Sequence, residues 1–352
     1  MPLMKTNPQG ESGTAAGGHQ PRTGPSSAGR IRRLRFVLGI LCALLMMAAA
    51  VLVYADLRRD YRHGIYRCAD GRMLEEPAVP DSLLIDKTAE TIAALHHDHP
   101  EISQYMMLVP SASYVQSGYL PQGAEIRNQA ADLSSVRAKT SPAAEWIDLL
   151  EIFREHNGEK LYYATDIWLT GWGSRYAARA ALEAMNAERP AGRDICYLLS
   201  DSFRGNLGKE ETLLRKLTNS RTERLEIYVP EKEAVYYRVD GTTGEWYGSL
   251  YDASALDGSY QYDVFFGGER ACTEIHTTAV NGEVLLVFGD RTADSIVPML
   301  VSSFEKIIYV HPEKYTGKLS GLLKKHRPTK ILYLYGANSF LRDGMLQRVL
   351  AR

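Results

Sequence analysis

The chain has 352 residues, of which 45% are hydrophobic and 24% charged, a composition that supports a large folded core. With a net charge of −1, the chain does not have the overall positive charge that favours nucleic-acid binding, so we expect no nucleic-acid partner. An α/β chain of this length can form one large domain, so a second domain is not required.

The N-terminal region changes character at residue 36. Residues 1–35 are rich in Gly, Ser, Pro and polar side chains, which predicts a disordered tail. Residues 36–55 are an uncharged apolar run, long enough for a helix to cross the ~30 Å hydrocarbon core of a bilayer. A cleaved signal peptide is the alternative, but its apolar segment usually has only about 7–15 residues. We therefore predict a transmembrane helix with membrane lipid as its partner.

Charge next to the run predicts its orientation. Arginines crowd its N-terminal side more tightly than its C-terminal side, which favours a cytoplasmic N-terminus in a cell membrane. The predicted order is then a cytoplasmic tail, a single-pass helix, a juxtamembrane connector over 56–80 with a turn at Asp70-Gly71, and an extracytoplasmic domain over 81–352.

From residue 81 the chain alternates helical and strand patterns. Apolar periodicity predicts helices over 81–96, 143–156 and 174–186, and buried strands over 104–109 and 161–163. Short Gly-punctuated strand patterns at 226–230, 235–239 and 262–266 indicate a β-rich insertion near residues 200–280.

The last third has the clearest pattern, in which strands alternate with helices: 284–288, 295–304, 306–310, 319–326, 330–335 and 342–350. This order predicts an α/β domain of three layers, with helices on both faces of a mainly parallel sheet. Ligands of such sheets bind beyond the carboxyl ends of the strands.

Cysteine and histidine do not predict a metal site. Cys68, Cys196 and Cys272 lie far apart, have no metal-ligand spacing and permit at most one disulfide among them. The run of residues 96–99, His-His-Asp-His, closes a helix, where histidine favours the negative end and adjacent side chains diverge. We expect no metal and no other cofactor.

Two segments carry a family resemblance. Residues 162–170 read Tyr-Tyr-Ala-Thr-Asp-Ile-Trp-Leu-Thr, and residues 288–295 read Phe-Gly-Asp-Arg-Thr-Ala-Asp-Ser. They resemble the two signatures of the DHHW family, Tyr-x-Thr-Asp-His-His-Trp-Thr and Lys-Asp-Ser-Tyr-Ala-Asn-Ser, and weaker matches extend the resemblance over roughly residues 60–345. It implies an SGNH hydrolase-like α/β/α domain outside the cell, related to alginate O-acetylation proteins. It also implies carbohydrate O-acetyl chemistry by a serine with aspartate and histidine.

This chain departs from both signatures at the catalytic positions. Asp166 and Asp290 are kept, but Ile167 and Trp168 replace the two histidines and Arg291 replaces the serine. Isoleucine offers no acceptor, an indole only donates, and arginine stays protonated. These five positions are therefore interpreted as vestigial, the catalytic residues are unidentified, and the chain is predicted to be a pseudoenzyme.

Two questions stay open from the residues alone. A relocated active site would need a hydroxyl of Thr292, Ser295 or Ser174 near His276, although Ser174 is more simply a helix cap and Ser295 an early helix residue. Arg291, at the start of a helix, is a candidate for binding a carboxylate or phosphate. An internal ion pair with Asp166 or Asp290 is the interpretation we favour.

Three functions follow as hypotheses. The first is a non-catalytic accessory or binding protein at the cell envelope, with a polysaccharide or a membrane acyltransferase as partner. The second is a carbohydrate O-acetyltransferase or esterase with relocated residues. The third is a subunit that dimerises with an active relative.

Overall fold

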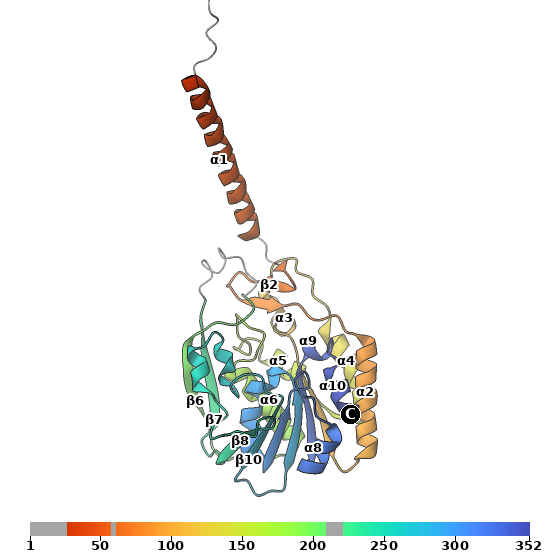
Figure 1. Cartoon of the computed structure of the whole chain (residues 1–352). Coiled ribbons are helices and arrows are strands. Elements are labelled where there is room, and N and C mark those ends of the chain that lie inside the picture. The colour runs from red at the N-terminus through yellow and green to blue at the C-terminus, as the bar shows by residue number, and fades with distance from the viewer. Residues whose placement is uncertain (1–26, 58–60, 209–220) are drawn as a thin grey trace, which may run out of the picture. The chain divides into compact units, whose positions relative to one another are not determined.

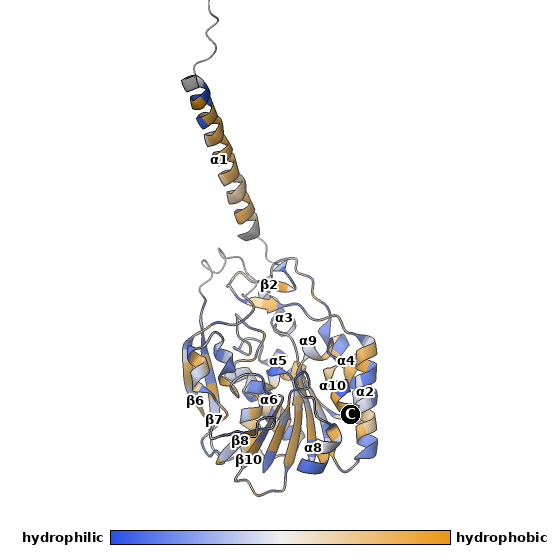
Figure 2. Cartoon of the chain, viewed as in Figure 1, coloured by the Kyte–Doolittle hydropathy of each residue, from blue (hydrophilic) through white to orange (hydrophobic). Residues whose placement is uncertain are grey.

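The computed structural model describes residues 27–57, 61–208 and 221–352. The chain divides into two compact units, Met1–Arg58 and Arg59–Arg352. Within the first unit, helix α1 (Ser27–Leu57) contains a span, Gly29–Ala55, none of whose residues is buried, and which is by length and composition a candidate for crossing a membrane (Figure 2). A signal sequence would have the same properties.

Helix α1 begins earlier than predicted. Its first residues, 27–35, belong to the segment predicted as disordered, and that prediction is wrong for them, because arginine is a good helix former and the arginine-rich stretch continues the apolar helix. The rest of the predicted tail, residues 1–26, lies outside the described residues.

The second unit starts with a small antiparallel sheet of β1 (Tyr61–Arg62), β2 (Ile65–Arg67) and β3 (Met73–Glu75), where only a connector was predicted. The predicted turn at Asp70-Gly71 is present. The Gly71 amide donates to the Cys68 carbonyl at 2.9 Å, and its φ of +83° is one that glycine adopts without strain.

An eight-stranded sheet forms the centre, in the order β5-β4-β13-β11-β12-β10-β8-β9 (Figure 1). The strands from β5 to β12 in this order are parallel, and β10, β8 and β9 continue the sheet antiparallel. Their bounds are β4 Ser103–Val109, β5 Glu145–Ile147, β8 Tyr236–Asp240, β9 Trp246–Tyr247, β10 Cys272–Thr277, β11 Val284–Gly289, β12 Lys306–Val310 and β13 Lys330–Gly336.

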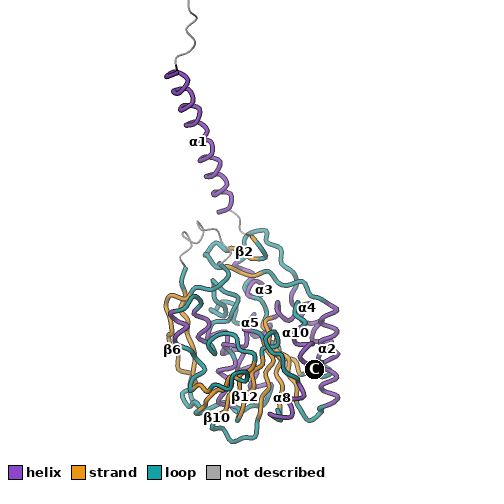
Figure 3. Tube along the Cα trace, in the orientation of Figure 1, coloured by secondary structure: helices purple, strands orange, loops and turns teal. Residues whose placement is uncertain are grey.

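Helices cover both faces of this sheet, which makes three layers (Figure 3). In β11, Leu285 and Val287 pack into one apolar core and Leu286 and Phe288 into the other, because successive side chains of a strand point to opposite faces. The first core is covered by α3 (Ala112–Val115), α5 (Leu149–Glu155) and α6 (Gly171–Ala184). The second is covered by α2 (Ser82–Asp98), α4 (Gln129–Thr140), α8 (Leu319–His326), α9 (Ala337–Phe340) and α10 (Met345–Leu350).

Several predicted elements differ in the structure. Residues 143–156 are not one helix but the edge strand β5 followed by α5, whose cap Asp148 accepts a hydrogen bond from the Leu150 amide at 3.2 Å. Residues 161–163 form only an isolated bridge between Tyr162 and Leu169. Residues 295–304 fold as short 3₁₀ helices, η4 (Arg291–Ser295) and η5 (Val297–Ser303), with Pro298 in the first turn of η5.

The predicted insertion divides between two sheets. Strands β6 (Asp194–Phe203) and β7 (Glu223–Pro230) form a separate two-stranded sheet, whereas β8, β9 and β10 belong to the central one. Residues 262–266, predicted as a strand, fall largely in a 3₁₀ helix, η3 (Gln261–Val264). The remaining short helices are η1 (Ser117–Tyr119) and η2 (Ala253–Asp257).

Candidate functional site

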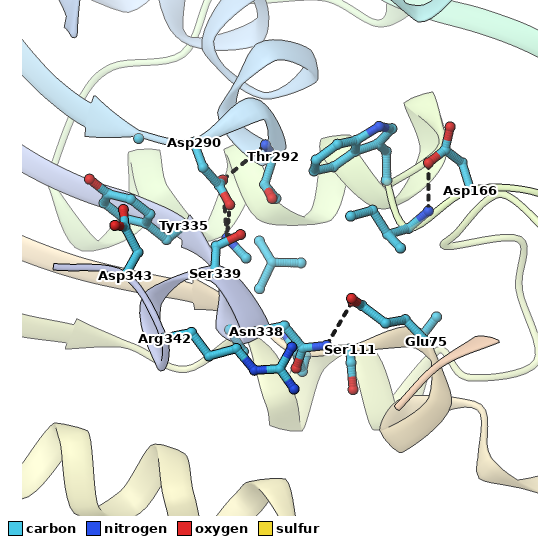
Figure 4. Close-up of a pocket in the computed structure, with 18 of the residues that line it drawn as sticks. Glu75, Ser111, Asp166, Asp290, Thr292, Tyr335, Asn338, Ser339, Arg342 and Asp343 are labelled. Atoms are coloured by element: carbon cyan, nitrogen blue, oxygen red, sulfur yellow. Dashed lines mark hydrogen bonds between the residues drawn. The ribbon is translucent and has the colours of Figure 1, made fainter. Parts of the chain in front are cut away.

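A cavity of about 430 Å³ opens at the carboxyl ends of the parallel strands (Figure 4). Residues that follow the strands line it: Ser111 after β4, Asp290 after β11, His311 after β12 and Asn338 after β13. This is the edge at which the alternating strand and helix pattern predicted a ligand site. The volume falls in the ~300–1,000 Å³ range usual for small-molecule pockets.

Four of the five positions that the sequence analysis interpreted as vestigial line this cavity. Asp166, Ile167 and Trp168 line it from one segment and Asp290 from another, although they are far apart in the sequence. Arg291 is not among the lining residues, because its side chain turns toward other partners.

The first signature is held in place by a side chain that the sequence did not point to. The carboxylate of Glu223, on β7, accepts hydrogen bonds from the amides of Ala164 (2.7 Å) and Thr165 (2.9 Å) and from the Thr165 hydroxyl (2.7 Å). The amide of Gly205 donates to that hydroxyl at 2.9 Å. A Cβ on Gly205 would lie 2.1 Å from the Thr165 carbonyl oxygen, so this close approach requires glycine.

Asp166 is a buried carboxyl with a full set of donors. Its Oδ1 accepts from the Ile167 amide at 2.8 Å, and its Oδ2 accepts from the Asn206 amide at 3.0 Å and the Tyr260 hydroxyl at 2.6 Å. Burial raises the pKa of Asp166 to about 6, against the opposing effect of these hydrogen bonds and of nearby Arg291.

Trp168, which the resemblance aligns with a histidine of the first signature, donates its indole N–H to the Tyr260 hydroxyl at 2.6 Å. The indole also stacks on Tyr262, with ring centroids 5.7 Å apart and an interplanar angle of 20°. Since an indole has no acceptor nitrogen and Ile167 is apolar, neither residue can take a proton from a nucleophile.

Arg291 forms an internal ion pair, but not with the predicted partners Asp166 and Asp290. Its Nη2 lies 2.7 Å from Asp263 Oδ1, and its Nε lies 3.4 Å from Asp294 Oδ2. The side chain is only 14% exposed, and its guanidinium carbon lies 5.3 Å from the ring centroid of Tyr260. These contacts leave little of the guanidinium for an external anion.

Asp290, which lines the cavity, has a structural role. Its Oδ1 accepts from the amides of Thr292 (3.0 Å) and Gly336 (3.2 Å), which joins the ends of β11 and β13. Burial raises the pKa of Asp290, and hydrogen bonds, including one from Ser339, oppose that rise.

The hydroxyls considered for a relocated active site do not meet a histidine. The Ser174 hydroxyl donates to the Ser295 hydroxyl at 2.8 Å, and both side chains are buried. Ser174 is not a helix cap, because Thr170 caps α6 by accepting from the Gly173 amide, and Ser295 closes the 3₁₀ helix η4. Across the described residues, no hydrogen bond joins a serine or threonine hydroxyl to a histidine ring.

His276 lies at the wrong edge of the sheet for that role. It pairs with Lys306, the first residue of β12, whereas Arg291 comes two residues after Gly289, the last residue of β11. The strands of the sheet therefore separate His276 from the cavity, where the histidine present is His311, to which the sequence assigned no role.

The cysteines and the histidines of residues 96–99 are not among the residues that line the cavity. Cys68 and Cys272 are buried, and Cys196 is exposed. In the described parts of the chain no three His, Cys, Asp or Glu side chains are arranged to hold a metal ion. His96 and His97 lie in the last turn of α2, and His99 is its C-cap.

With this geometry in view, a family model described as DHHW protein matches residues 102–311. The chain belongs to the DHHW family. This confirms the resemblance that the two signatures indicated. No curated protein matches the chain.

Solved structures agree with the family assignment. A DHHW family protein from Eubacterium siraeum superposes with a TM-score of 0.67 at 19% identity, over 82% of this chain and 95% of that one. Bacillus cereus PatB1 superposes with a TM-score of 0.66 at 18% identity, over 80% and 97%. At such identities the likeness concerns the fold alone, and it confirms the predicted SGNH-like α/β architecture.

Proposed function

We propose that this DHHW-family chain is a membrane-tethered, non-catalytic protein whose α/β domain serves an accessory or binding role in polysaccharide O-acetylation at the cell envelope. Its partner is a polysaccharide or a membrane acyltransferase. One observation carries the proposal: Arg291 and Trp168 occupy the family's serine and histidine positions, and both are engaged in internal contacts.

The physical reason concerns the loss of both halves of the catalytic pair. A serine hydroxyl becomes an effective nucleophile only when a neighbouring base takes its proton. Position 291 has no hydroxyl, and Trp168 donates its indole N–H, the only polar group of its side chain, to Tyr260. Loss of a triad member lowers the rate by many powers of ten, so what remains useful is the cavity as a binding site.

Helix α1 supports the tether. Its uncharged apolar run, residues 36–55, matches the ~20 residues that a bilayer core requires, and none of the residues from Gly29 to Ala55 is buried within the protein. With arginines concentrated at the N-terminal end of the helix, the domain lies outside the cell in this proposal.

A second candidate function, an esterase with relocated residues, has one observation in its favour. Ser339 and Ser111 line the same cavity as His311, and Ser339 hydrogen-bonds Asp290. The observation is weaker, because in the described chain neither hydroxyl hydrogen-bonds His311.

An ester-hydrolysis assay distinguishes the non-catalytic proposal from the esterase alternative. The full-length chain in detergent micelles is incubated with p-nitrophenyl acetate beside its Ser339→Ala and Ser111→Ala variants. We expect all three to release nitrophenol at the same background rate. Turnover that one serine substitution abolishes would establish the esterase instead.

The accessory role is tested in the source organism by deleting the gene and measuring ester-linked acetate on purified wall polysaccharide. We expect less acetate in the deletion strain and full restoration by either the unchanged gene or its Ser339→Ala form. Unchanged acetate content would rule out the accessory role.

A further inference from the structure

His311 contributes a polar surface to the cavity that the family signatures do not involve. It follows β12 directly, its side chain lines the cavity, and the residue is only 4% exposed. Neither ring nitrogen has a hydrogen-bond partner within the described protein. Buried polar atoms are costly to leave unpaired, so an imidazole in this position indicates that the cavity receives a hydrogen-bonding guest.

The protonation state of the His311 ring indicates which kind of ligand the cavity can bind. Burial lowers the pKa of His311, which favours the neutral imidazole. A neutral imidazole presents one donor and one acceptor on opposite sides of the ring. Hydroxyl groups both donate and accept, so a molecule with several hydroxyls satisfies both nitrogens.

The charged side chains that line the cavity restrict the class of ligand further. Five carboxyl side chains line the cavity, against one arginine, Arg342: they are Glu75, Asp166, Asp290, Glu313 and Asp343. The second arginine nearby, Arg291, is held by Asp263 and Asp294. An anionic ligand would therefore meet an excess of carboxyl groups, and the single cation of the lining is itself solvent-exposed.

We propose that the cavity binds a saccharide that carries no negative charge, with His311 contacting its hydroxyls and Asp343 a hydroxyl or amino group. Neutral sugars and amino sugars fit this description, and polyuronates do not. The inference rests on the proposed function and names its ligand class. Figure 4 shows Asp343, Asp290 and Ser339 on one side of the cavity, and Glu75, Asn338 and Ser111 nearer the opposite side.

The test is calorimetric titration of the full-length chain in a sugar-free polyoxyethylene detergent. Three probes of equal length are used: a tetramer of N-acetylglucosamine, a tetramer of glucosamine and a tetramer of mannuronate. We expect saturable binding of at least one of the first two and no binding of the mannuronate. His311→Phe, which keeps a ring but removes both nitrogens, should weaken binding at least tenfold.

The matched control is His326→Phe, because His326 is also buried with an unpaired ring nitrogen, Nδ1, but does not line the cavity. The His326→Phe variant should bind the saccharide probes as tightly as the unchanged chain does. If His311→Phe does not fold, Asp343→Asn replaces it, with the same expected loss for the glucosamine tetramer.

Three outcomes would overturn the inference: tight binding of the mannuronate, no binding of either uncharged or amino probe, or full affinity in a folded cavity variant. None of them bears on whether the chain hydrolyses acetyl esters. The failure of the ligand class is thus distinguishable from the failure of the non-catalytic proposal.

Discussion

The Trp168 indole donates a 2.6 Å hydrogen bond to the Tyr260 hydroxyl, which in turn donates a 2.6 Å hydrogen bond to Asp166. Every step of this relay runs from a donor toward the carboxylate. A catalytic histidine would instead offer an acceptor nitrogen at one end while Asp166 accepted from the other. Because both hydrogen bonds point toward the carboxylate, the Trp168 indole offers no acceptor for a proton from a nucleophile, as the non-catalytic proposal requires.

Tyr260→Phe should destabilise the domain by about 1–3 kcal/mol, because it leaves the Trp168 N–H unpaired and removes a donor from buried Asp166. Urea unfolding followed by tryptophan fluorescence measures the change. Tyr335→Phe is the matched control, since that buried hydroxyl has no hydrogen-bond partner among the described residues. Equal stabilities of the two variants would contradict the relay.

The raised pKa of Asp166, about 6, predicts a pH dependence. The folded state binds this proton more tightly than the unfolded chain, whose aspartate pKa is ~3.9. The contribution of Asp166 to stability therefore falls as pH rises from about 4 to about 6 and is constant above that window. Two pKa units correspond to roughly 3 kcal/mol.

The free energy of unfolding of the unchanged chain minus that of Asp166→Asn should decrease by an amount of this order across the window. Asp240→Asn is the control: hydrogen bonds and Arg270 lower the pKa of Asp240, so its contribution is lost only toward lower pH. Its difference curve should be flat above about pH 5. A flat curve for Asp166→Asn as well would show that its pKa is not raised.

Arg291→Ser, which restores the family's residue, should not restore hydrolysis, because Trp168 still offers no base. It should destabilise the domain by about 3 kcal/mol near pH 8, since buried Asp294 loses its cation. Burial raises the pKa of Asp294 to about 7, and loss of the arginine raises it further. At pH 5 the Asp294 carboxyl is therefore protonated and no longer needs a cation beside it. The loss should therefore be smaller at pH 5 than at pH 8.

Thermal or urea unfolding of Arg291→Ser at the two pH values measures this difference. Arg291→Lys, which keeps a positive charge, should show a smaller loss with less pH dependence. Acetyl-ester turnover by Arg291→Ser would refute the reasoning about Trp168.

Cys196 provides a test of the proposed orientation, because it is exposed while Cys68 and Cys272 are buried. A membrane-impermeant maleimide should label the chain in intact cells, and Cys196→Ser should remove the label. Labelling only after permeabilisation would place the domain on the cytoplasmic side.

The fold was predictable where apolar patterns are long. Strands β4, β11, β12 and β13 are buried on both faces, so each reads as a continuous apolar run. Residues 143–156 were misassigned because the apolar residues of a three-residue edge strand and a following helix can share helical spacing. A strand of three residues is too short to show the two-residue alternation of side chains that identifies a strand.

The site was predictable only through family positions. The signatures located Asp166, Trp168 and Arg291, but not the residues that engage them. Tyr260 is 94 positions from Asp166, and Glu223 is 58 from Thr165. Contacts of that separation depend on how the sheet and its insertion fold together, which local spacing in one sequence does not encode.

Asp290 ties the ends of β11 and β13 together through backbone amides. That role is independent of any chemistry, so the residue serves equally in an enzyme and in a binding protein built on this fold. A motif search that scores this aspartate therefore detects strand-end geometry. Under the non-catalytic proposal, the residue at position 291, and not the aspartate at position 290, distinguishes enzymes from non-enzymes among chains that carry this signature.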